Sequence, residues 1–102
     1  MIHVIATITT KPGTRPQVLE AFGWVTPFVR AEDGCIEYQA TVDVKTTLAV
    51  QDGPREDAIT VVEKWASVEA LYAHTKAPHM AEYREKVKDF VTSVKLVVSE
   101  PV

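Results

Sequence analysis

The 102-residue sequence predicts an α+β fold in which a four-stranded antiparallel sheet carries its helices on one face. Two observations lead to this prediction. Apolar residues alternate in four short segments, as they do in strands, and recur every three to four residues in other segments, as they do in helices. The length and the 46% hydrophobic content are typical of one globular domain, which we expect to span residues 1–102.

The first strand is predicted over residues 2–10, where apolar residues alternate, and a Pro-Gly turn at residues 12–13 ends it. Thr14 and Gln17 then have the spacing of a capping box, in which two side chains satisfy free backbone N–H groups at a helix start. A first helix is therefore predicted over residues 15–32.

A second strand is predicted over residues 35–43 and a third over residues 58–66, because apolar residues alternate in both. The long connection at residues 44–57 contains turn residues, and within it residues 47–50 could prolong the second strand. This connection could be a lid over a site or an arm that reaches a second copy.

Two helices are predicted next, one capped by Ser67 and one beginning at Pro78, followed by a fourth strand over residues 92–98. The order βαββαβ is that of a ferredoxin-like fold. The inner faces of the two helices are predicted to carry Val68, Leu71, Tyr72 and Thr75 in the first, and Met80, Tyr83, Val87 and Phe90 in the second.

Both faces of the predicted sheet carry apolar residues, such as Val4 beside Ile5 and Val61 beside Val62. Helices can cover only one face, and each Å² of apolar surface left in water costs about 25 cal/mol. We therefore expect two copies to pack sheet against sheet as a homodimer. The alternative is a solvated outer face, with residues such as Thr7 pointing outward.

Charge, hydropathy and cysteine content exclude several classes of protein. The net charge of −3 comes without a lysine and arginine cluster, so no nucleic acid partner is expected. The longest apolar run, residues 70–73, is far shorter than the roughly 20 residues of a membrane span, so no membrane partner is expected. Cys35 is the only cysteine, which fits a reducing compartment and a cytoplasmic location.

Four stretches of the sequence together resemble the antibiotic biosynthesis monooxygenase family, in its quinol monooxygenase branch: residues 11–13, 30–38, 62–74 and 77–80. The resemblance implies a homodimeric α+β barrel with a pocket between sheet and helices in each subunit. It also implies a monooxygenase that oxidises a quinol or related dihydroxy-aromatic with molecular oxygen, without metal or flavin. The rival interpretations are an isomerase on the same scaffold and a ligand-binding dimer without turnover.

His74 and His79 are the candidate catalytic bases, because both flank apolar helix positions and an imidazole titrates near neutrality. The alternative is that each is a half-exposed histidine near a helix end. The five-residue spacing with Pro78 between them disfavours a two-histidine metal site, and no metal is expected.

Trp65 and Glu63 are predicted to share one sheet face. The family resemblance implies that Trp65 walls the pocket and that Glu63 positions another side chain, although Trp65 could simply be core. A carboxylate between apolar neighbours needs a partner, and we expect Arg30, or a basic residue of a second copy, to pair with Glu63.

The remaining aromatic residues are candidate walls for an aromatic substrate, either through ring contact or through a tyrosine hydroxyl. An apolar stripe at helical spacing can equally be core. Some family oxygenases use an asparagine near the third strand, and this sequence contains none. These substrate-binding candidates are Tyr72, Tyr83, Phe28 and Tyr38.

Overall fold

The computed structural model describes residues 1–102 and confirms the predicted α+β class. Four strands and three helices follow one another in the predicted order. The elements are β1 (Ile2–Thr10), α1 (Arg15–Arg30), β2 (Cys35–Thr41), β3 (Ala58–Trp65), α2 (Val68–Thr75), α3 (Pro78–Val87) and β4 (Val91–Ser99).

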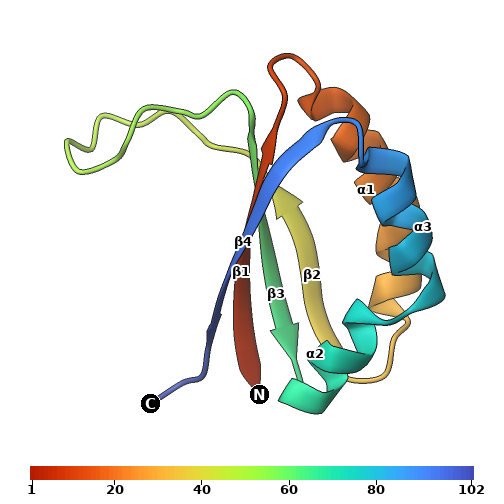
Figure 1. Cartoon of the computed structure of the whole chain (residues 1–102). Coiled ribbons are helices and arrows are strands. Elements are labelled where there is room, and N and C mark those ends of the chain that lie inside the picture. The colour runs from red at the N-terminus through yellow and green to blue at the C-terminus, as the bar shows by residue number, and fades with distance from the viewer.

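The four strands form one antiparallel sheet in the order β2-β3-β1-β4. All three helices lie on the same face of this sheet (Figure 1). The pairing of β1 with β3 sets Val4 opposite Glu63 and Ala6 opposite Val61. Because side chains alternate across a strand, these four residues all point toward the helices.

The core lies between this inner sheet face and α1. Val4 and Val61 from the sheet and Val18, Val25 and Val29 from α1 are almost completely removed from solvent. Full burial of a valine contributes about 1.5–3 kcal/mol. This contact fixes α1 against the sheet and leaves the space beside β4 to α2 and α3.

All three helices begin where the sequence predicts, but only one of the two predicted caps forms. Ser67 has an extended backbone and accepts a hydrogen bond from the Ala70 N–H at 3.1 Å, as predicted. The capping box at Thr14 is wrong, because Thr14 has ψ near 1° rather than an extended backbone. Its hydroxyl instead donates to the Lys11 carbonyl at 2.7 Å.

The predicted prolongation of the second strand is also wrong. β2 ends at Thr41, and residues 42–57 form a loop that leaves the sheet on the side away from the helices (Figure 1). At the base of this loop Arg55 makes two short hydrogen bonds to the Asp43 carboxylate, 2.8 and 2.9 Å long. The loop stays outside the helix-covered layer of this chain.

The sheet face opposite the helices is uncovered in the single chain (Figure 1). At its centre Ile5 pairs with Val62 on one side and with Val97 on the other. Ile5 is 39% exposed and Val97 is 63% exposed. An apolar patch therefore runs across three adjacent strands.

None of the helices is both long and apolar enough to cross a bilayer.

Candidate active site

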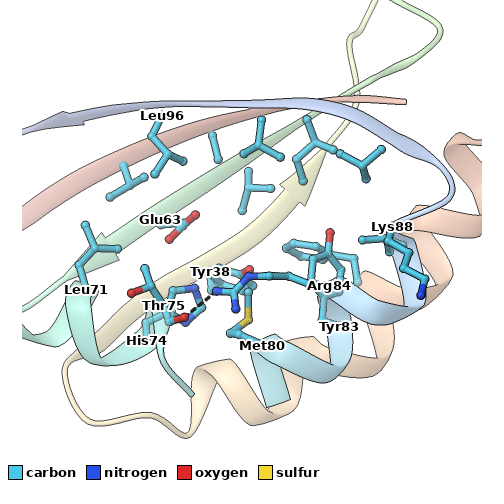
Figure 2. Close-up of a pocket in the computed structure, with 18 residues that line it drawn as sticks. Tyr38, Glu63, Leu71, His74, Thr75, Met80, Tyr83, Arg84, Lys88 and Leu96 are labelled. Carbon is cyan, nitrogen blue, oxygen red and sulfur yellow. Dashed lines mark hydrogen bonds between the residues drawn. The ribbon is translucent and has the colours of Figure 1, made fainter. Parts of the chain in front are cut away.

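A cavity of about 500 Å³ lies between the inner sheet face and the helices α2 and α3. Figure 2 shows the sheet residues above the cavity and the helix residues below it. Of the 18 lining residues 13 are hydrophobic, so the cavity suits an apolar ring better than a charged molecule. The few polar side chains then decide how a ligand is oriented.

Glu63 is the polar group of the sheet side. It projects from β3, next to its cross-strand neighbour Tyr38 of β2, toward His74 on the helix side of the cavity (Figure 2). Its Oε1 accepts a hydrogen bond from the Trp65 indole N–H at 2.9 Å. Burial raises the pKa of Glu63, the Trp65 hydrogen bond opposes that rise, and the charge of Glu32 adds to it.

The expected pair between Arg30 and Glu63 is wrong. Arg30 donates from Nε and Nη2 to the Tyr38 carbonyl, at 3.2 and 3.0 Å, and from Nη2 to the Gln39 side chain at 3.0 Å. Its guanidinium is engaged at the backbone and side chains of β2, while Glu63 points into the cavity. The partner of Glu63 is the indole that shares its sheet face.

His74 is the polar group of the helix side and is almost completely buried in the wall of the cavity. Its ring lies 4.6 Å from the Trp65 ring and 5.4 Å from the Tyr38 ring, measured between centroids. Its Nδ1 lies 2.9 Å from Oε2 of Glu32. Burial lowers the pKa of His74, and the hydrogen bond to Glu32 opposes that effect.

The other ring nitrogen of His74, Nε2, makes no hydrogen bond within the chain. No buried side-chain nitrogen or oxygen of this structure lacks a partner, so Nε2 is not sealed off. Because Nδ1 contacts Glu32, Nε2 is the ring nitrogen of His74 that remains for a ligand in the cavity that His74 lines.

His79 lies outside the cavity wall. Its Nε2 is 2.7 Å from the same Glu32 Oε2, and its ring stacks on Phe28 with 5.8 Å between centroids. Glu32 therefore joins the two histidines, a role that the sequence analysis missed. Glu32 is 42 residues from His74 along the chain, and no local spacing rule connects them.

Two of the predicted aromatic residues, Tyr38 and Tyr83, line the cavity. Burial raises the pKa of both, to about 12 for Tyr83, so both hydroxyls keep their proton at neutral pH and can donate. Phe22 also lines the cavity and stacks on Tyr38 with centroids 5.0 Å apart. Phe22 was not among the candidate site residues predicted from the sequence.

The other predicted aromatic residues do not line this cavity. Tyr72 is 59% exposed because α2 turns Leu71 and His74 inward, which also corrects the predicted inner face of that helix. Phe28 is 50% exposed and packs against Trp24 and His79 on the outside of α1. Trp65 is fully buried behind Glu63, so it supports the wall without forming it.

Arg84 and Lys88 of α3 also line the cavity, and neither was singled out from the sequence. Arg84 donates to the Thr75 carbonyl at 2.6 Å, drawn as a dashed line in Figure 2. Lys88 forms an ion pair with Glu85.

No group of three or more His, Cys, Asp or Glu side chains is arranged to hold a metal ion. His74, His79 and Glu32 meet at hydrogen-bond distances.

A model of the antibiotic biosynthesis monooxygenase family matches residues 1–86 of this chain. The chain is 37% identical over 103 aligned residues to the protein named "Probable quinol monooxygenase YgiN" of Escherichia coli K12, with 99% of this chain and 98% of that protein covered. The chain therefore belongs to the antibiotic biosynthesis monooxygenase family. It is a monooxygenase, and its fold is of the α+β class that the sequence predicts.

Solved structures agree on the fold. Rv0793 from Mycobacterium tuberculosis superposes with a TM-score of 0.79 at 27% identity, over 99% of this chain and 94% of that one. PA3566 from Pseudomonas aeruginosa gives a TM-score of 0.81 at 22% identity, over 99% and 93% of the two chains, which shows the fold alone.

Proposed function

We propose that this monooxygenase oxidises a quinol or related dihydroxy-aromatic with molecular oxygen, without a metal or a flavin. The observation that carries the proposal is the cavity itself, which is lined mostly by apolar side chains and also by Glu63 and by His74, whose Nε2 makes no hydrogen bond within the chain. The name of the Escherichia coli relative supports the choice of a quinol.

The chemistry divides between substrate and protein. A quinol plus O2 gives a hydroxyquinone plus water, so one oxygen atom enters the ring and the other leaves as water. The four electrons come from the substrate, because a deprotonated quinol is electron-rich enough to reduce oxygen. The protein has to bind the ring, take a proton and exclude water.

His74 is the base of this proposal. The substrate hydroxyl donates to Nε2, which is free within the chain, and the lowered pKa of His74 keeps that nitrogen unprotonated at neutral pH. Tyr38 and Tyr83 donate to substrate oxygens, since their raised pKa values keep both hydroxyls protonated. Phe22 and the aliphatic lining hold the ring.

A homodimer completes the proposal. The patch formed by Ile5, Val62 and Val97 is apolar and faces away from the helices. The loop at residues 42–57 leaves on the same side and carries four exposed large apolar residues, Val42, Val44, Leu48 and Val50. A second copy packed on this face would bury both features. A cytoplasmic location remains a prediction from the single cysteine.

Oxygen uptake with a panel of hydroquinones and naphthohydroquinones tests the proposed reaction. Under labelled oxygen we expect one labelled atom in the hydroxyquinone product and one in water. Binding of these compounds without uptake would favour a ligand-binding dimer, and a rearranged product without uptake would favour an isomerase.

His74→Ala tests the base, with an expected loss of turnover of roughly 10²- to 10⁴-fold, the usual contribution of a general base. His79→Ala should lose less, because His79 does not line the cavity. Tyr72→Ala, at an exposed position of α2 that does not line the cavity, is the control. A larger loss in His79→Ala than in His74→Ala would overturn the assignment of the base.

A further inference from the structure

Glu32 is a half-buried carboxylate outside the cavity, and one of its oxygen atoms receives two histidines. Oε2 of Glu32 lies 2.9 Å from Nδ1 of His74 and 2.7 Å from Nε2 of His79. A carboxylate at such distances accepts hydrogen bonds, so each of these ring nitrogens carries a proton. Because a neutral imidazole carries one N–H proton, Nε2 of a neutral His74 is then unprotonated.

We propose that Glu32 is the positioning residue of the site: it holds His74 as the Nδ1–H tautomer and thereby makes Nε2 the basic atom that faces the cavity. The role of His74 as a base rests on the proposed function, whereas the tautomer does not depend on it. In the other tautomer Nε2 would carry a proton and could only donate to a ligand.

The backbone around Glu32 keeps the carboxylate in place. The turn between α1 and β2 is closed by hydrogen bonds from the Glu32 N–H to the Val29 carbonyl and from the Cys35 N–H to the Glu32 carbonyl. Gly34, with φ near +82°, lets this turn approach α2, since a Cβ there would lie 2.6 Å from Cβ of Ala70. The turn is thus fixed directly against the helix that carries His74.

His79 gives Glu32 a second donor from a different helix. Its ring is held by stacking on Phe28, so its Nε2 approaches Glu32 from α3 while His74 approaches from α2. Two donors on one oxygen limit the rotation of the carboxylate. His79 therefore supports Glu32, and it does not have to touch the substrate.

The charges that face His74 come from several elements. Glu32 lies on the turn, Glu63 on β3, and Arg84 and His79 on α3. Glu32 raises the pKa of His74, while burial, His79 and Arg84 lower it. Replacing Glu32 by a neutral residue therefore moves the titration of His74 to lower pH.

The test is Glu32→Gln, read first by NMR of the ¹⁵N-labelled imidazole rings, which distinguishes the two histidine tautomers without any substrate. Wild-type protein is expected to show His74 as the Nδ1–H form. The glutamine variant should lose that preference, because its amide can present an N–H to Nδ1. An unchanged Nδ1–H signal in folded Glu32→Gln protein would overturn the proposal.

Turnover gives the second measurement. In Glu32→Gln we expect kcat to fall roughly 10- to 100-fold, the range found when the hydrogen-bond partner behind a metal-binding histidine is removed. KM should change little, and the acidic limb of the pH profile should move to lower pH. Glu69→Gln, an exposed carboxylate on α2, is the matched control and should match wild type.

Two further variants keep the test decisive. If Glu32→Gln fails to fold, Glu32→Asp retains the acceptor one methylene short, and a partial loss of the Nδ1–H form is expected. His79→Ala should keep His74 in the Nδ1–H form, and a switch there would overturn the assignment to Glu32. If no quinol is oxidised by wild-type protein, the proposed function fails, and the NMR result still decides the role of Glu32.

Discussion

The two faces of the sheet are built from the same strands and differ in what covers them. On the inner face Val4, Ala6 and Ile8 of β1 are buried by helices. On the outer face Ile5, from the same strand, is 39% exposed and its neighbour Val97 is 63% exposed. In the same strand Ile5 is flanked on the outer face by the polar residues His3 and Thr7, so the sequence itself favours the inner face as the core.

The covered face itself is not uniform. Toward β2 it is packed by α1, while over β1 and β4 it opens into the cavity, where Val94 and Leu96 remain exposed although they pair with the inner-face residues of β1. Packing therefore supplies rigidity at one end of the layer, and incomplete cover supplies a binding space at the other. The polar groups of the site stand at the boundary between these two parts.

The largest expected effect is at the packed end. Trp65→Ala removes a fully buried ring and the hydrogen bond to Glu63, and we expect it to lower the free energy of unfolding by about 3–5 kcal/mol. Urea unfolding measures this. Val97→Ala on the outer face is the control, and in the monomer it should cost less than about 0.5 kcal/mol. Similar losses in both variants would contradict the distinction between the two faces.

The next effect concerns the contact between α2 and the turn that joins α1 to β2. Gly34→Ala adds a Cβ that meets Ala70 at 2.6 Å and places alanine at φ near +82°, so we expect a loss of about 2–4 kcal/mol in urea unfolding. Gly13→Ala is the matched control, because Gly13 has a similar φ of +78° and open space around it. It should show the backbone strain alone, about 1–2 kcal/mol. Equal losses would mean that the contact with α2 is unimportant.

The outer face gives the third prediction. If two copies cover it, Val97→Lys places a charge in the interface and should weaken the dimer at least about tenfold, or about 1.4 kcal/mol, with the fold intact. Light scattering over a range of concentrations measures the effect. Val68→Lys, an exposed valine on the helix layer, should leave the assembly unchanged. Wild-type protein that stays at 11.3 kDa would contradict the proposed dimer.

Much of this architecture could be predicted because it depends on local periodicity. The strands, their order and the Ser67 cap follow from alternation, spacing and a single side chain. Two of the errors come from a helix rotation and from a long-range contact, which no local pattern contains. Tyr72 was expected inside because it neighbours Leu71, yet α2 turns His74 inward instead. Glu32 was missed because only the fold brings it to the two histidines.

The smallest expected effect is the pH dependence caused by Glu63. Its pKa is raised above 4.5 in the folded protein, so its contribution to stability is complete below pH 4.5 and is lost as the pH rises through the folded value. In Glu63→Gln this loss of stability at higher pH is absent, because glutamine does not ionise. Its amide oxygen can still accept the hydrogen bond from Trp65. The stability of the variant relative to wild type should therefore increase with pH above about 4.5 and then level off.

The difference in stability between wild-type protein and Glu63→Gln separates the effect of Glu63 from that of His74. The effect of His74 on stability has the opposite pH dependence. The lowered pKa of His74 adds stability above pH 6.5 that is lost as the pH falls, and this contribution is common to both proteins. Urea unfolding of each from pH 4 to 8 measures this difference. If the difference in stability stays constant with pH, the pKa of Glu63 is the same in the folded and unfolded protein. Glu63 would then be in contact with water, which would contradict its burial.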